Sequence, residues 1–76
     1  MNFDVFVQKI ADLFEETEIL FTPDTKFKEL PEWSSLMALS VIAMIDEEYG
    51  VTINGGSIRE SETIEDLYNF VKAVEN

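Results

Sequence analysis

The stretch EWSSLMALSVIAMIDEEYG, residues Glu32–Gly50, contains the most apolar segment of the chain. Its apolar residues recur at intervals of three and four, which is typical of an α-helix. Gly50 follows the last of them, where a left-handed C-terminal cap favours glycine. We therefore predict a helix that begins at Ser34 or Ser35 and ends at Tyr49. The rest of the fold must be built around it.

This predicted helix is apolar on nearly its whole circumference. At about 100° per residue, the face expected in the core carries Ala38, Val41, Ile42, Ile45 and Tyr49. The opposite face carries Leu36, Met37, Ser40, Ala43, Met44 and Glu47. A small domain cannot easily enclose such a helix, so either an outside partner contacts this second face or the preceding connection covers it.

Length and composition narrow the possible functions. A chain of 76 residues can build a single compact core, and we expect residues 1–76 to form one domain. Cysteine and histidine are both absent, which excludes disulfides, thiolate zinc sites and thiol catalysis and removes the commonest general base. No side chain is placed to activate a serine. We therefore expect a protein that is not an enzyme and has no metal site.

The net charge of -11 comes from sixteen acidic and five basic residues. Such a chain repels nucleic acid and anionic membranes, so we expect neither as a partner and favour basic protein surfaces. The paired carboxylates at Glu15-Glu16 and Asp46–Glu48 are expected to be solvated, and weak binding of divalent ions to them stays open. No signal peptide and no run of roughly 20 apolar residues is present, which predicts a cytoplasmic protein.

The N-terminal half contains another helix and a long connection. Residues 3–15 predict an amphipathic helix with an apolar stripe of Phe3, Phe6, Val7, Ile10, Leu13 and Phe14. Residues 17–34 form the connection, punctuated by Pro23 and Pro31. Its apolar side chains are expected to pack across the helices; they are Ile19, Leu20, Phe21, Phe27, Leu30 and Trp33. The pair Lys26 and Lys28 is expected to be solvated.

The C-terminal third predicts a short helix and a last main helix. We expect a flexible turn at Gly55-Gly56, a short helix over residues 57–60, and a capping box in which Thr63 and Asp66 begin the last helix. The apolar face of that helix is expected to carry Ile64, Leu67, Tyr68, Val71 and Val74. The predicted fold is all-α: a small four-helix bundle, with three main helices and one short helix, and a long first loop.

From Phe27 to Val71 the chain resembles acyl carrier proteins. Ser34-Ser35-Leu36 stands at the start of the second helix, where that family has Asp-Ser-Leu, and Glu47–Gly50 matches the family's pattern at the end of the same helix. TIEDLYNFV, residues 63–71, matches its last helix. The spacing between these elements needs no gap. The resemblance implies an acyl-carrier-protein-like bundle.

The same resemblance implies a function. Ser35 would carry a 4'-phosphopantetheine arm, installed from coenzyme A by a phosphopantetheinyl transferase. The arm's thiol would hold an acyl or aminoacyl group as a thioester for acyl-loading and acyl-transferring enzymes of fatty-acid, polyketide or another specialised pathway. Such enzymes would dock on the second helix of a monomer. The residues implied in partner contact are Ser34, Leu36, Met37, Ser40, Met44 and Glu47.

Two features depart from the family's pattern. Ser34 replaces its aspartate, and we predict that Ser34 is the helix N-cap, since serine and aspartate are both good caps. Met37 and Ser40 stand where members often have acidic residues, which predicts more apolar docking and a specialised pathway.

Trp33 either packs under the loop or flanks the arm. The alternative function is an unmodified helical protein-protein interaction module derived from a carrier fold, and the state of Ser35 separates the two.

Overall fold

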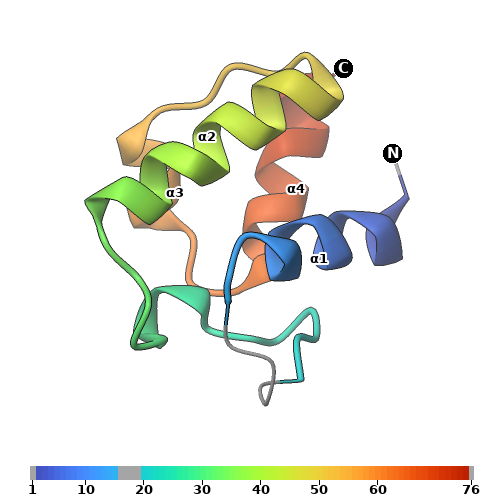
Figure 1. Cartoon of the computed structure of the whole chain (residues 1–76). Coiled ribbons are helices and arrows are strands. Elements are labelled where there is room, and N and C mark those ends of the chain that lie inside the picture. The colour runs from blue at the N-terminus through green and yellow to red at the C-terminus, as the bar shows by residue number, and fades with distance from the viewer. Residues whose placement is uncertain (1, 16–19, 76) are drawn as a thin grey trace.

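The computed structural model describes residues 2–15 and 20–75, so the predictions made for Glu16, Thr17 and Ile19 lie outside the described residues. Its elements, in chain order, are α1 (Phe3–Asp12), η1 (Phe27–Glu29), α2 (Ser35–Tyr49), α3 (Gly55–Glu60) and α4 (Ile64–Glu75). The described residues contain helices and no strand. The predicted all-α bundle, with three main helices, one short helix and a long first loop, is confirmed (Figure 1).

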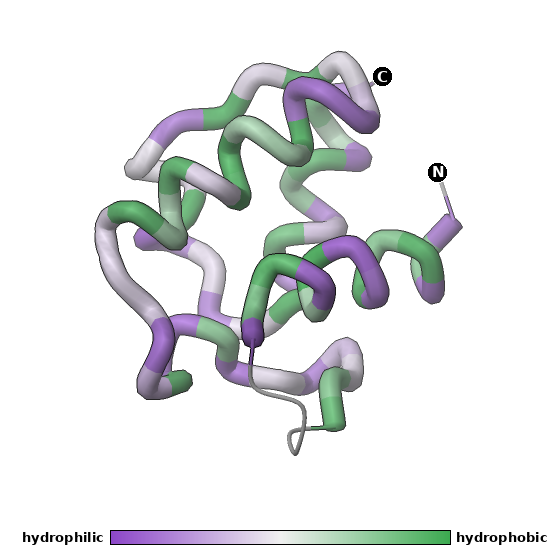
Figure 2. The backbone as a smooth tube through the Cα atoms, in the orientation of Figure 1, coloured by the Kyte–Doolittle hydropathy of each residue, from purple (hydrophilic) through white to green (hydrophobic). Residues whose placement is uncertain are grey.

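The helices enclose one apolar core. α2 packs on α3, and α4 packs on both α1 and α3. In Figure 2, apolar and hydrophilic segments alternate along α1 and α4, as expected for helices with one buried face. The core side chains with no exposed surface are Phe6, Ile10, Phe27, Val41, Ile45, Ile64, Leu67 and Val71. Val74 is 49% exposed, so its predicted place on the buried face of α4 is wrong.

Helix α1 is shorter than predicted. It ends at Asp12 because the chain tightens there: the N–H of Leu13 donates to the carbonyl of Ile10 at 3.1 Å, and that of Phe14 to Ala11 at 3.0 Å. Phe14 lies beyond the helix but is still buried. The predicted apolar stripe therefore reaches the core, although its last residues are not helical.

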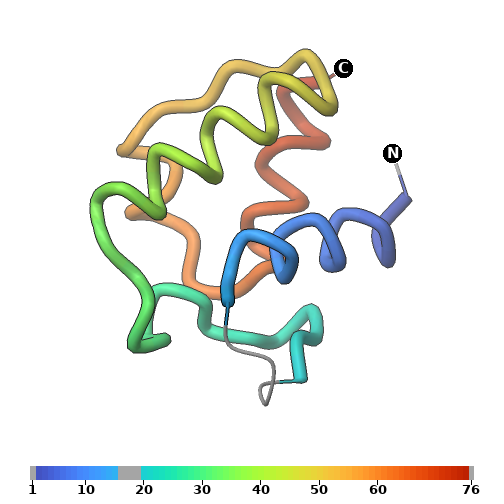
Figure 3. The backbone as a smooth tube through the Cα atoms, viewed as in Figure 1, coloured from blue at the N-terminus to red at the C-terminus, as the bar shows by residue number. Residues whose placement is uncertain are grey.

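The connection between α1 and α2 is part of the core rather than a free loop. Figure 3 traces it from residue 20, below α1 and the start of α4, up to α2. Phe27 in η1 is fully buried, and its ring forms a T-shaped pair with that of Trp33, with centroids 5.3 Å apart. Leu20 is the exception among the apolar residues described here: it is 83% exposed, so its predicted packing is wrong.

Backbone groups of the connection cap the first turn of α4. The carbonyl of Thr25 accepts a hydrogen bond from the N–H of Ile64 at 3.1 Å, and the carbonyl of Pro23 accepts one from Glu65 at 2.9 Å. The first N–H groups of a helix have no partner within the helix. The connection supplies these partners, and it is thereby tied to an element far away in the sequence.

A long-range contact also corrects the prediction for Lys28. Its ammonium group donates a hydrogen bond to the carbonyl of Arg59 at 2.8 Å, near the end of α3. A cation is favoured at a helix C-terminus because it interacts with the last carbonyl groups. Lys28 is therefore engaged in structure rather than simply solvated.

The segment after α2 combines a confirmed cap with a corrected turn. Gly50 adopts φ 65°, and its N–H donates to the carbonyl of Asp46 at 2.9 Å, as a left-handed C-cap requires. Gly55 and Gly56 are the first residues of α3 rather than a flexible turn. The Asn54 side chain caps this helix by accepting a hydrogen bond from Ser57, which accounts for the earlier start.

The predicted capping box at the start of α4 is confirmed. The Thr63 hydroxyl accepts the N–H of Asp66 at 3.1 Å, and the Asp66 carboxylate accepts the N–H groups of Thr63 and Glu62. These backbone hydrogen bonds favour the charged carboxylate and lower the pKa of Asp66.

Within the described residues, no helix has the length and apolar character needed to cross a membrane.

Candidate attachment site at the start of helix α2

Ser34 and Ser35 occupy different positions at the start of α2. Ser34 is the N-cap, and its hydroxyl accepts a hydrogen bond from the N–H of Met37 at 3.1 Å. Ser35 is the first residue of the helix and is exposed. Within the described part of the chain, its hydroxyl makes no hydrogen bond. The predicted cap is confirmed, and the second serine is accessible to another molecule.

The electrostatics around Ser35 suit an anion. The first turn of α2 contains no acidic residue, so nothing there offsets the positive end of the helix dipole. Unpaired backbone N–H groups at such an end favour phosphate groups. A phosphodiester on the Ser35 oxygen would therefore lie in a favourable place, even though the whole chain is strongly acidic.

A groove of about 620 Å³ opens beside Ser35, between α2 and α3. It is lined by Trp33, Ser34, Ser35, Ala38, Leu39, Ile42, Gly55, Ile58 and Arg59. Trp33 both packs against Phe27 and lines this groove, so the two roles considered for it are compatible. The groove gives an arm attached at Ser35 a mainly apolar surface to lie against.

The second face of α2 remains largely uncovered. Leu36 is 76% exposed, and Ser40 and Glu47 are also exposed, so the connection does not cover this face. Met37 and Met44 are half-buried and pack against the core. The structure therefore presents Leu36 as an outward ridge, with the two methionines at the sides of the helix.

A second groove, of about 430 Å³, lies between α1 and α2. It brings together three of the predicted partner-contact residues, Ser40, Met44 and Glu47. Lys9 and Glu48 also line it and form an ion pair with 2.6 Å between nitrogen and oxygen. The hydrogen bond from Lys9 to Glu48 raises the pKa of Lys9. The exposed ridge of α2 thus has a groove on each side.

Two residues of this region were missed by the sequence analysis. Leu39 is 61% exposed and borders the groove beside Ser35. Its spacing of three residues from Leu36 is a signal that could have placed it on the exposed stripe. Arg59 reaches the same groove from α3, and no local pattern indicates this, because it depends on how α3 packs on α2.

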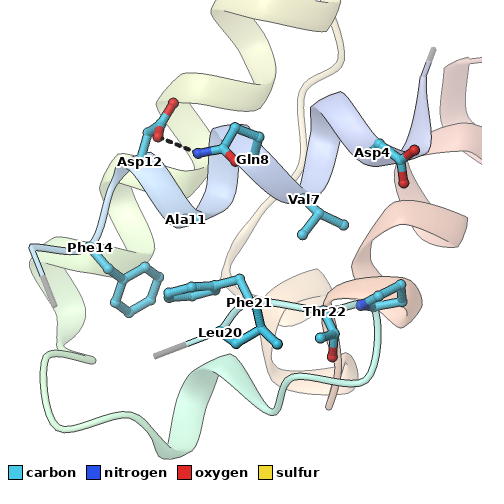
Figure 4. A pocket seen from close by; sticks show the side chains of 10 residues that line it. Asp4, Val7, Gln8, Ala11, Asp12, Phe14, Leu20, Phe21 and Thr22 are labelled. Carbon is cyan, nitrogen blue, oxygen red and sulfur yellow. Dashed lines mark hydrogen bonds between the residues drawn. The ribbon is translucent and has the colours of Figure 1, made fainter. Parts of the chain in front are cut away.

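A third groove, of about 630 Å³, lies between α1 and the connection (Figure 4). Phe14 and Phe21 face each other there, with ring centroids 5.3 Å apart, and Gln8 donates a hydrogen bond to Asp12 at 2.8 Å. None of the predicted site residues lines it. No group of three or more acidic side chains among the described residues is arranged to hold a metal ion.

A small helical bundle with an exposed serine at the start of α2 is compatible with a carrier domain. Comparison with known proteins agrees. The family model described as the phosphopantetheine attachment site matches residues 4–71. The chain is 33% identical over 64 residues to an acyl carrier protein of Treponema pallidum subsp. pallidum, covering 84% of this chain and 82% of the relative. The acyl carrier protein of Treponema pallidum strain Nichols gives the same values.

The chain therefore belongs to the family of acyl carrier proteins with a phosphopantetheine attachment site. No solved structure matches it significantly. Membership makes the chain a carrier rather than an enzyme, and phosphopantetheine is its cofactor. The exposed serine and the groove beside it are compatible with such an arm.

Proposed function

We propose that this chain is an acyl carrier protein, with residues 1–76 as one carrier domain, in which Ser35 bears the phosphopantetheine arm. The observation that carries the proposal is the state of Ser35, the first residue of α2, which is exposed and whose hydroxyl makes no hydrogen bond to the residues that the structure describes. Ser34 fits the role less well, because its oxygen already accepts the Met37 N–H as the helix cap.

The attachment step is a phosphoryl-type group transfer from coenzyme A. The Ser35 oxygen forms a bond to the phosphorus that bears pantetheine, and the pyrophosphate bond of coenzyme A breaks. Adenosine 3',5'-bisphosphate leaves, and the serine proton passes to the transferase. The chain has no histidine to accept this proton, and we assign the base to a separate phosphopantetheinyl transferase.

When attached, the arm supplies a terminal thiol that can hold an acyl or aminoacyl group as a thioester. The residues of the chain itself form the surface that partner enzymes recognise. The proposed contact surface for the transferase and for acyl-loading and acyl-transferring enzymes consists of Ser34, Leu36, Met37, Ser40, Met44 and Glu47, together with Leu39. We place the carrier in the cytoplasm as a monomer, without nucleic-acid or membrane partners, in fatty-acid, polyketide or specialised biosynthesis.

The composition of this surface supports mainly apolar docking. Leu36 and Leu39 are both more than half exposed, and Ser40 beside them uses its hydroxyl to donate to the carbonyl of Leu36 at 3.1 Å. Apolar contacts are screened less by salt than ion pairs are. Partner binding should therefore depend less on ionic strength than the net charge of -11 suggests.

The test is to incubate the protein with coenzyme A and a broad-specificity phosphopantetheinyl transferase and to measure its intact mass. We expect the addition of one arm to the wild type and no addition to Ser35→Ala. An equal gain of mass in the Ser35→Ala variant would move the attachment point elsewhere. A wild type that gains no arm would favour the unmodified interaction module, with the serine at position 34 as the departure that prevents modification.

A further inference from the structure

Arg59 is the charged residue among those that line the groove beside Ser35. Its guanidinium lies over the bare backbone of the first turn of α3. A Cβ atom added at Gly55 would lie 3.5 Å from its Nη1 atom, and one added at Gly56 would lie 3.6 Å from Nη2. The two glycines therefore leave the guanidinium room beside the groove.

This guanidinium has no anionic partner in the described part of the chain. The ion pair found among residues 2–15 and 20–75 is Lys9–Glu48, and the hydrogen bond at Arg59 uses its backbone carbonyl as an acceptor for Lys28. An unpaired arginine stands out where acidic residues outnumber basic ones sixteen to five. The N–H donors of the planar guanidinium group match the geometry of phosphate oxygens, so an arginine can bind a phosphate through two parallel hydrogen bonds.

We propose that Arg59 binds the phosphodiester of the arm and so directs the arm along the groove between α2 and α3. This inference rests on the proposed attachment at Ser35. Ser35 and Arg59 line the same groove from opposite helices, so a phosphate bonded to the Ser35 oxygen enters the space that Arg59 borders. Charge complementarity selects this occupant, since a phosphodiester is anionic and the groove is otherwise uncharged.

The floor of the groove fits the remainder of the arm. Ala38, Ile42 and Ile58 offer apolar surface, which suits the geminal methyl groups of pantetheine. Lys28 binds the C-terminal end of α3 and Asn54 caps its start, so the helix that carries the exposed Arg59 is tied at both ends. The arm therefore has a resting position, anchored at the phosphate, from which a partner must draw it.

The experiment is nuclear magnetic resonance on the modified, isotope-labelled protein after intact mass has shown that the arm is present. We expect the Arg59 Nε–H resonance to shift between the unmodified and modified forms, and we expect proton contacts between the arm and both Trp33 and Ile58. Arg59→Gln should lower the docked fraction of the arm about two- to five-fold, because an exposed ion pair contributes little more than that. Arg59→Lys should retain part of the effect.

Lys26→Gln is the matched control, since it removes the same charge at an exposed position outside the groove. It should leave the arm's contacts unchanged, and backbone resonances of α1 and α4 should show that every variant is folded. A modified wild type whose arm makes no contact with the groove, or equal contacts in the wild type and Arg59→Gln, would overturn this inference alone. A chain that gains no mass at Ser35 would overturn the proposed function and this inference together.

Discussion

The Ser34 hydroxyl lies 3.1 Å from the backbone nitrogen of Met37 and accepts its hydrogen bond. This bond separates the roles of two identical neighbours, because it engages Ser34 in the helix and leaves Ser35 accessible. Ser34 therefore caps α2 at the position where the resemblance places the family's aspartate.

Replacing Ser34 should therefore change stability according to capping ability. Ser34→Ala should lower the free energy of unfolding by about 1 kcal/mol, because the Met37 N–H loses its partner. Ser34→Asp should leave stability within about 0.5 kcal/mol of the wild type, since aspartate is an equivalent cap. Urea denaturation measures both variants. Equal loss in the two would show that the hydrogen bond at Met37 is not what stabilises the start of α2.

The connection should contribute to stability as a core element does. Phe27→Ala should lower the free energy of unfolding by about 3–5 kcal/mol, because it leaves a cavity beneath Trp33. Leu20→Ala in the same connection is the control, and its effect should stay within about 0.5 kcal/mol, since this side chain is 83% exposed. Thermal and urea unfolding would reveal the contrast. Similar losses in both variants would contradict the packing of η1 described above.

The capping box at α4 predicts a pH dependence. The pKa of Asp66 lies below its ordinary value of 3.8 in the folded state, so the carboxylate stabilises the fold at neutral pH. That contribution is fully present above 3.8 and is lost as the pH falls through the lower folded pKa. Asp66→Asn should therefore be less stable than the wild type at pH 7, and the difference should shrink on acidification.

Titration of the Asp66 carboxyl carbon by nuclear magnetic resonance checks the direction of the shift. Its midpoint should fall below 3.8 in the folded protein. Thr63→Val is the matched variant, because it removes the hydroxyl that accepts the Asp66 N–H but keeps the backbone N–H groups that bind the carboxylate. It should lower stability while preserving most of the shift. A wild-type midpoint at or above the ordinary value would contradict the capping box as the cause.

The net charge of -11 predicts that salt stabilises the fold. Moderate salt or magnesium should raise the melting temperature, by about 4–8 °C for each kcal/mol of repulsion that is screened. Glu47→Gln removes one exposed negative charge without touching the Lys9–Glu48 pair, and it should raise the melting temperature at low salt more than at high salt. Calorimetry at several ionic strengths measures this. A flat response would show that self-repulsion contributes little.

Features governed by local patterns were predicted from the sequence. Periodicity located α2 and its buried residues Val41 and Ile45, and the left-handed cap at Gly50 followed from glycine after the last periodic residue. The capping box of Thr63 and Asp66 was predicted because its partners are three residues apart. Each of these depends on interactions within one or two helical turns, which a single sequence displays directly.

Features that depend on packing between distant segments were not predicted. Lys28 was expected to be solvated, yet its partner is a carbonyl 31 residues away. Gly55-Gly56 suggested a turn, but Asn54 caps them into a helix that packs on α2. For the same reason, Arg59 could not be placed beside Ser35. Ser35 was proposed as the attachment point from the pattern around it, whereas the groove beside it depends on the arrangement of two helices.

The placement of Trp33 has a practical consequence. It is the only tryptophan in the chain. Its indole ring packs against Phe27, and Trp33 also lines the groove beside Ser35. Indole emission changes with the polarity of its surroundings, so the protein contains its own fluorophore at the place where an arm or a docking enzyme would arrive. Modification and partner binding can therefore be followed optically in the unlabelled wild type, with excitation selective for one residue.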